Sequence, residues 1–247
     1  MKKILAKIRK ADELYSLIED GDRIAVGISG GKDSTLLLYA LHLYQYLCKN
    51  SLNKNFEVIG IHIDLNFGEE DFKPLIDLFK KCNINYISEP SKVADILKIN
   101  LKNDKIQCSL CSKLKKGAVI KTAKKYHCNK VAFAHHADDA IETLFLNMIY
   151  GGKLATFDPK MYLTNSKITF IRPLIKVYEN EIIDAVKRLK LPKLKSGCPN
   201  DGYTKRQDIK ELLASIYQQF PEAKDNFLLS LHNKKQINLF DLKKNKD

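Results

Sequence analysis

Short apolar stretches alternate with amphipathic stretches of helical length over the first 150 residues of the chain. The strand-like stretches are residues 23–28, 56–63, 86–87 and 130–134, and the helical patterns between them cover 33–47, 71–81 and 112–126. Connections of this length favour parallel strands, because a helix returns the chain to the same edge of the sheet. The sequence therefore predicts an α/β fold with a Rossmann-like, doubly wound parallel sheet.

The remaining patterns predict helical additions to this core. Helices are expected over 2–19, 138–149, 179–190 and 207–218, and a further strand over 168–171. We interpret residues 1–220 as a single domain. Its parts are an N-terminal helix (1–20), an α/β core (21–175) and a helical part (176–220) that carries Cys198, and a C-terminal extension follows (221–247).

The charge of the chain favours an anionic partner. Its 247 residues include 42 Lys and Arg against 29 Asp and Glu, a net charge of +13. Nucleic acid is the first candidate. Only five of the basic residues are Arg, so a compositional preference for Lys is an equally good explanation. No apolar run approaches the roughly 20 residues that a membrane helix needs, and the first residues lack the apolar centre of a signal peptide. We expect a soluble, cytoplasmic protein that does not enter a membrane.

A glycine-containing loop joins the first predicted strand to the next helix. Its sequence is Ser29-Gly30-Gly31-Lys32-Asp33-Ser34. Glycines let the backbone approach an anion closely, and the free N–H groups of a helix start bind phosphate oxygens. The two serines can donate hydroxyls, Lys32 adds positive charge, and Asp33 can hold magnesium. The spacing differs from the Walker motif. A simple glycine turn with a serine cap is the structural alternative.

Polar residues also follow other predicted strands. His135, His136, Asp138 and Asp139 come directly after a buried stretch, and Asp64 ends another. In doubly wound sheets ligands bind at the carboxyl ends of strands, so these side chains are candidates for the same site as the glycine loop. The alternative is that Asp138 or Asp139 caps the helix that follows. Asp64 can bond a ribose or an adenine edge, or cap a loop.

Two of the six cysteines form the pair Cys108-Ser109-Leu110-Cys111, and Cys198 lies in a Gly-Cys-Pro turn. Disulfides are not expected in a cytosolic chain, so the spacing favours a metal or cluster site. Three cysteines suit an iron–sulfur cluster with one open iron. His127, Cys128 or Asp201 would complete a four-ligand zinc site instead. Two unrelated cysteines at a helix start are the remaining interpretation, and a thioredoxin-like dithiol is less favoured.

The glycine loop resembles the signature of the PP-loop ATP pyrophosphatases. Further motifs are similar to the tRNA 2-thiocytidine synthetases, in that family's order and over about residues 10–220. These motifs are Cys-Ser-Leu-Cys-Ser at 108–112, Ala-His-His-Ala-Asp-Asp at 134–139, Glu-Thr-Leu-Phe-Leu-Asn-Met at 142–148, Tyr-Gly-Gly-Lys-Leu at 150–154, Arg-Pro-Leu at 172–174 and Arg-Gln at 206–207. The resemblance implies an ATP-dependent, iron–sulfur tRNA thiolase.

In such an enzyme ATP adenylates the base carbonyl oxygen, and sulfur then replaces it. The resemblance implies that Cys108, Cys111 and Cys198 hold a [4Fe–4S] cluster with one free iron. It also implies that the glycine loop and the segment 135–139 bind ATP, with Asp33 and Asp139 organising magnesium or phosphate. These two aspartates and the three cysteines are the predicted catalytic residues. Many family members carry a further cysteine where this chain has Asp201, which puts a role for Asp201 as an oxygen ligand in doubt.

The partners implied are tRNA, a sulfur donor such as a cysteine desulfurase, and a second copy in a homodimer. Lysines crowd the stretch after the cysteine pair, where a phosphate backbone would be attracted, although a solvated helix face is the plain alternative. The predicted RNA contacts are Lys113, Lys115, Lys116, Lys153 and Arg172. Tyr150 or Phe157 would stack on the extracted base.

Three other functions compete with this interpretation. Uridine thiolases share the chemistry but often add zinc-binding cysteines at their ends, and this sequence has no Cys before Cys48 or after Cys198, which favours cytidine 32. Lysidine synthetase has a similar loop and does not need the cysteine pair. A non-catalytic RNA-binding iron–sulfur protein would release no pyrophosphate.

Overall fold

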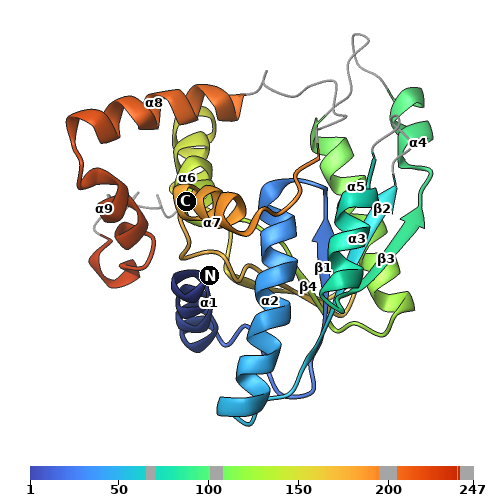
Figure 1. Cartoon of the computed structure of the whole chain (residues 1–247). Coiled ribbons are helices and arrows are strands. Elements are labelled where there is room, and N and C mark those ends of the chain that lie inside the picture. Colours follow the sequence, from blue (N-terminus) through green and yellow to red (C-terminus); the bar gives the residue numbers. More distant parts are fainter. Residues whose placement is uncertain (65–70, 101–107, 195–204, 238, 240–247) are drawn as a thin grey trace, which may run out of the picture. The chain divides into compact units, whose positions relative to one another are not determined.

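The computed structural model describes residues 1–64, 71–100, 108–194, 205–237 and 239 (Figure 1). The chain divides into two compact units. Unit 1 comprises Met1–Asp139 and Phe157–Thr204, and unit 2 comprises Ala140–Thr156 and Lys205–Asp247. Among the described residues, no helix is both long and apolar enough to span a membrane.

Unit 1 is built on a six-stranded sheet in the order β3-β2-β1-β4-β6-β5. The strands are β1 (Arg23–Ile28), β2 (Glu57–Asp64), β3 (Asn85–Pro90), β4 (Lys130–Ala132), β5 (Lys160–Leu163) and β6 (Ile168–Ile171). All neighbouring pairs are parallel except β5 and β6, which are antiparallel. In register, Ile28 of β1 pairs with His62 of β2 and Val26 pairs with Ala132 of β4. The predicted parallel sheet is confirmed, with an antiparallel strand added at one edge.

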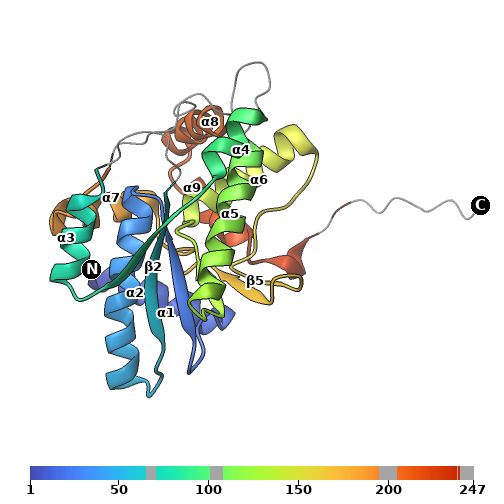
Figure 2. The same ribbon diagram turned by 90° about the vertical axis from the view of Figure 1, so that its right-hand side faces the viewer.

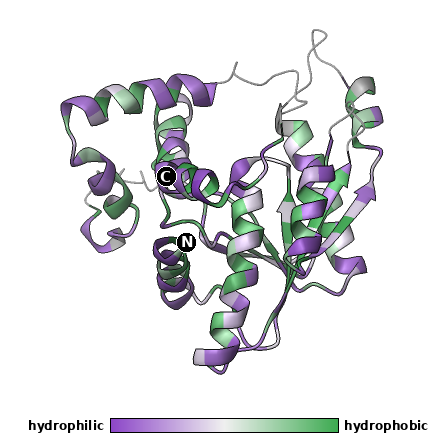
Figure 3. Ribbon diagram, viewed as in Figure 1, coloured by the Kyte–Doolittle hydropathy of each residue, from purple (hydrophilic) through white to green (hydrophobic). Residues whose placement is uncertain are grey.

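Helices cover both faces of this sheet. On one face lie α2 (Lys32–Ser51) and α7 (Glu179–Leu189), and α5 (Cys108–Lys125) lies on the other (Figure 2). Successive residues of β1 alternate between the two faces, which is why almost the whole strand is buried. Ala25 packs with Val119 and Ala123 of α5. In Figure 3 the central strands are mainly coloured as hydrophobic, as burial on both faces requires, whereas the helices mix hydrophobic and hydrophilic residues.

The close fit of α2 depends on Gly60 in β2. A Cβ atom at this position would lie 2.5 Å from Cδ2 of Leu38 in α2. A larger residue at position 60 would force the buried Leu38 side chain, and α2 with it, away from the sheet. The contact fixes α2, and with it the loop that precedes the helix, against the middle of the sheet.

A buried ion pair secures the opposite edge of the sheet, where the strands begin. Lys130 Nζ lies 2.7 Å from Asp22 Oδ2, and both side chains are at most 4% exposed. Lys130 also donates to the carbonyl oxygen of Leu17 at 3.0 Å, and Asn129 donates to Asp22 at 2.7 Å. These bonds satisfy charges that would otherwise be costly to bury.

Several predicted boundaries were wrong. The first helix, α1 (Lys2–Tyr15), ends before residue 19 because Ser16 adopts a left-handed conformation with φ 48°. The helix α5 begins at Cys108, four residues earlier than predicted. The helices α4 (Val93–Ile99) and α9 (Ala223–Ser230) and the strand β5 were not predicted, whereas α3 (Lys73–Lys81) and β3 were. The short apolar patterns of the missed elements are too brief to give a clear period.

Unit 2 contains most of α6 (Ala137–Gly151), together with α8 (Lys205–Gln219), α9 and the short 3-10 helix η1 (Lys234–Gln236). Its core is formed by Ile141, Ile209 and Leu213. Arg206 Nη1 donates to the buried Glu142 at 3.0 Å, which joins the start of α8 to α6. The predicted division of the chain at residue 220 stays a prediction.

Candidate functional site

The order of the strands creates a switch point between β1 and β4. The chain leaves β1 toward β2 on one side and leaves β4 toward β6 on the other. Ligands of doubly wound sheets bind at the carboxyl ends of the two strands that flank such a point. The glycine loop follows β1 and residues 133–136 follow β4, so the two predicted nucleotide-binding segments meet at this edge.

The glycine loop makes a tight turn into α2. Gly30 has φ 80°, which favours glycine, and a Cβ atom here would lie 2.9 Å from Cδ1 of Leu194. The Leu194 amide donates to the Gly30 carbonyl oxygen at 3.0 Å. The Ser29 and Ser34 hydroxyl oxygens lie 3.2 Å apart, and Ser34 donates to the Gly31 carbonyl at 3.1 Å. The loop is thus held before any ligand binds.

Lys32, the first residue of α2, is held by two carboxylates. Its Nζ lies 2.9 Å from Glu179 Oε1 and 3.2 Å from Asp33 Oδ2. Burial works against the charge of this half-buried lysine. The hydrogen bond to Glu179 and the charge of Asp33 outweigh that effect, so the pKa of Lys32 is raised. The ammonium group is therefore fully charged at neutral pH beside the helix start.

Asp33 also has an oxygen that suits a metal ion. Its Oδ1 is buried and has no hydrogen-bond partner among the described residues. A buried carboxylate oxygen without a partner is unfavourable unless a cation or water occupies the space next to it. Magnesium prefers carboxylate and phosphate oxygens, so the donor chemistry of Asp33 fits this ion.

The histidine–aspartate segment caps two helices. Asp139 Oδ2 accepts the His136 amide at 2.9 Å at the start of α6, which is the capping role considered as an alternative. Asp138 Oδ2 accepts the amide of Glu179 at 2.7 Å, at the start of α7 rather than of its own helix. The binding roles predicted for both residues stay predictions. The caps fix their carboxylates at the edge of the sheet.

Two polar residues end β2. The His62 ring lies 3.8 Å from the Phe72 ring, centroid to centroid, and its Nδ1 is 3.1 Å from the Ile28 carbonyl oxygen. The carbonyl of Asp64 accepts the Ser91 hydroxyl at 2.8 Å. His62 thereby connects the ends of β1 and β2, just before the glycine loop.

Arg172 lies inside unit 1 and not on its surface. Its guanidinium carbon lies 4.7 Å from the Phe157 ring centroid, and its Nη1 donates to the carbonyl of Asp158. Burial lowers the pKa of Arg172, an effect that the charge of Asp158 opposes. The Phe157 ring also lies 5.1 Å from the ring of His135. The predicted RNA contact of Arg172 stays a prediction, and the observed contacts give it a structural role.

The cysteine pair begins α5. This helix runs opposite to β4, so its first turn lies at the same edge of the sheet as the glycine loop. Cys111 is half-buried, and Cys198 and Asp201 lie outside the described residues. Lys113 and Lys116 are exposed and Lys115 is half-buried on α5, and the exposed Lys153 follows α6. Within the described part of the chain, no group of three metal-binding side chains gathers.

Sequence reasoning missed two residues at this edge, Glu179 and Leu194. Glu179 is an acidic residue at a predicted helix start, a signal that also fits simple stabilisation of the helix dipole. Leu194 carried no signal, because its packing against Gly30 depends on contacts far apart in the sequence. Both residues contact the glycine loop and belong to the candidate site.

A doubly wound sheet with a phosphate-type glycine loop at its switch point defines a nucleotide-binding α/β protein of the PP-loop class. The family model described as "PP-loop domain" matches residues 3–195. The tRNA-cytidine(32) 2-sulfurtransferase of Geotalea uraniireducens (strain Rf4) is 35% identical over 241 residues, which are 97% of this chain and 94% of that protein. The enzyme of the same name from Geobacter sulfurreducens is 34% identical over 243 residues, with 98% and 93% covered. The chain belongs to this family of PP-loop proteins.

A solved structure is similar in fold. The U34-tRNA thiolase NcsA from Methanococcus maripaludis with its [4Fe-4S] cluster superposes with a TM-score of 0.73, at 23% identity, over 96% of this chain and 79% of that one. The similarity confirms the predicted fold class.

Proposed function

We propose that the protein is an ATP-dependent tRNA thiolase that converts cytidine 32 of tRNA to 2-thiocytidine. The observation that carries the proposal is the meeting of the glycine loop and the cysteine-bearing start of α5 at one edge of the sheet. The name shared by relatives of 34–35% identity over nearly the whole chain supports the cytidine substrate.

The chain's own residues account for the first step. The amides at the start of α2 and the ammonium of Lys32 bind the phosphates of ATP, and Asp33 would hold a magnesium ion that neutralises phosphate charge. The base carbonyl oxygen attacks the α-phosphorus, and the bond to pyrophosphate breaks. The helix start and Lys32 stabilise the charge that develops on the departing pyrophosphate. Adenylation makes the base oxygen a leaving group, which departs as part of AMP when sulfur attacks the carbon in the second step.

The second step requires sulfur at the same edge. Three cysteine thiolates, here Cys108, Cys111 and Cys198, suit a cubane iron–sulfur cluster. Cys108 and Cys111 lie in the first turn of α5, at the edge of the sheet where the glycine loop lies. These three cysteines would hold a [4Fe–4S] cluster, which would supply the sulfur that bonds to the base carbon as AMP leaves. We further propose that a donor such as a cysteine desulfurase supplies this sulfur, that the enzyme is a homodimer, and that it acts in the cytoplasm.

The test begins with anaerobic purification and analysis of iron and sulfide. About four of each per chain are expected for one cubane cluster. Zinc without iron would overturn the role of the cysteines in sulfur transfer. Thiolation of tRNA is then assayed by nucleoside mass spectrometry with Cys108→Ala, Cys111→Ala and Cys198→Ala. We expect loss of 2-thiocytidine with ATP binding retained, and Cys48→Ala serves as the control because Cys48 is buried elsewhere. Thiouridine or lysidine as the product would identify a competing function.

A further inference from the structure

We propose that Glu179 is a positioning residue for Lys32, held in place by Asp138, so that three separate segments orient one ammonium group for ATP. The inference rests on the proposed ATP binding by the glycine loop and adds residues outside that loop. Glu179 lies 147 positions from Lys32 in the sequence, and its Oε1 accepts from Nζ at 2.9 Å.

The carboxylate of Glu179 is itself fixed by its backbone. Glu179 is the first residue of α7, and its amide donates to Asp138 Oδ2 at 2.7 Å. A second bond joins the same segments, because the Ala137 amide donates to the carbonyl of Val177 at 2.9 Å. The backbone at the start of α7 is therefore bonded to the segment after β4, and the Glu179 side chain extends from there to Lys32 in the segment after β1.

The need for Glu179 follows from the two roles of Asp33. Asp33 Oδ2 contacts Lys32, and its buried Oδ1 suits magnesium. With magnesium bound at Oδ1, the Asp33 carboxylate would carry less negative charge and would hold Lys32 more weakly. Glu179 then keeps Nζ at the loop. An ammonium group has three donors, so a phosphate oxygen can bind Lys32 while the contact with Glu179 persists.

The charge of Glu179 matters more than its hydrogen bond. The side chains of Lys32 and Glu179 are only 21% and 26% exposed, so solvent screens their attraction incompletely. A neutral glutamine at position 179 keeps the shape and an acceptor oxygen but loses this attraction. The lysine then orders only when ATP binds, and that ordering lowers the affinity.

The experiment measures binding of the magnesium complex of an ATP analogue with a methylene bridge between the α- and β-phosphates. The full chain, carrying its cluster, is titrated by calorimetry. We expect Glu179→Gln to weaken binding about fivefold to tenfold, because the glutamine oxygen can still accept from Lys32 Nζ but the bond is no longer assisted by the negative charge. The KM for ATP in pyrophosphate release should rise by the same factor with kcat little changed, because the contact exists before and during the reaction.

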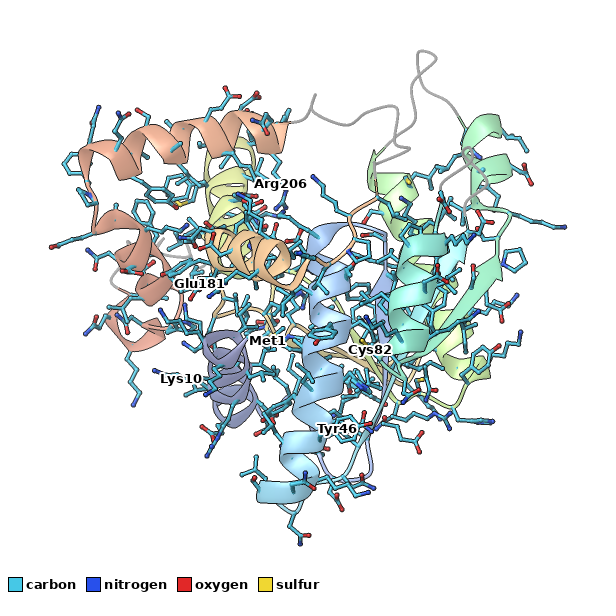
Figure 4. The ribbon with its side chains drawn as sticks, in the orientation of Figure 1. Met1, Lys10, Tyr46, Cys82, Glu181 and Arg206 are labelled. Atoms are coloured by element: carbon cyan, nitrogen blue, oxygen red, sulfur yellow. The ribbon has the colours of Figure 1, made fainter. Side chains whose placement is uncertain are left out.

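Glu181→Gln is the matched control. Glu181, labelled in Figure 4, lies two residues further along α7 and pairs with Lys7 of α1 at 2.5 Å, so its replacement removes a similar ion pair that does not involve the glycine loop. Glu181→Gln should leave the affinity unchanged. An equal loss in both variants, no loss in Glu179→Gln, or tighter binding in Glu179→Gln would each overturn the proposal.

Asp138 is tested through Glu179. Asp138→Ala should weaken binding of the analogue. Asp138→Asn should bind like the wild-type protein, because its side chain keeps an acceptor oxygen for the Glu179 amide. The double variant Asp138→Ala/Glu179→Gln should bind no more weakly than Glu179→Gln alone. Additive losses would show that Asp138 acts independently and would overturn its place in the proposal. If the wild-type protein does not bind the analogue, the proposed function fails and this inference fails with it.

Discussion

Replacing Gly30 by alanine tests whether the glycine loop is held by the segment that ends at Leu194. The alanine would have to adopt φ 80°, and its Cβ would lie 2.9 Å from Leu194 Cδ1 and 3.3 Å from Leu194 Cβ. A left-handed conformation costs about 1–2 kcal/mol for a residue with a side chain. Crowding of a packed site adds about 1–3 kcal/mol, and the flexible end of Leu194 places this position at the lower part of that range. We expect the free energy of unfolding to fall by about 2–4 kcal/mol.

Gly21 provides the matched control. It has φ 79°, but no atom lies within 4 Å of its would-be Cβ. Gly21→Ala should therefore show only the conformational part, about 1–2 kcal/mol. Urea unfolding followed by circular dichroism measures both variants, and titration with the ATP analogue measures the loop itself. Equal losses in the two variants would refute the contact with Leu194, and an unchanged stability of Gly30→Ala would refute the conformational argument as well.

Three further predictions concern the rest of unit 1. Lys130→Met leaves Asp22 charged and buried, so the free energy of unfolding should fall by about 3–5 kcal/mol in urea, and a fall below about 1 kcal/mol would contradict the ion pair. Gly117→Ala, within α5 and with open space around its Cβ, should raise the melting temperature through a gain of about 0.5–1 kcal/mol. Burial raises the pKa of the Cys128 thiol to about 11. In the cluster-free protein at pH 8, iodoacetamide should therefore modify Cys111 far faster than Cys128, as followed by mass spectrometry. Because the thiol loses its proton at lower pH in the unfolded chain than in the folded one, the contribution of Cys128 to stability should fall as the pH rises from about 9 to 11.

The alternation of strands and helices and the position of the loop were predictable because local sequence patterns encode both. After Arg23, β1 reads as a continuous run of small and apolar residues, and Ser29 and two glycines follow it, so the sequence indicates a strand, a turn and a helix without further context. Asp138 shows where this reasoning stops. Its position before a helix predicts a cap for that helix, but the amide it accepts belongs to Glu179, which only the folded chain brings near.

The missed elements have the same origin. β5 is a short antiparallel strand whose partner, β6, gives it its register, and its own four residues contain no clear alternation. The role of Leu194 depends on a glycine far away in the chain, so no local pattern could reveal it. Contacts of this kind are set by the topology of the sheet, and they decide how the loop is held.

The distance in sequence between the parts of the site has a consequence for how the protein matures. The loop after β1 is complete only when the chain as far as Leu194 has folded back onto it, so nearly all of unit 1 must be synthesised before ATP can bind. Contacts of such long range make folding slow, because a large loop must close before they contribute. In the proposed function, ATP is a ligand of the folded unit, and a ligand that binds only the folded state stabilises it. At a concentration 100 times its Kd, ATP would stabilise the folded state by about 2.7 kcal/mol, so the substrate would also increase the folded fraction of the enzyme.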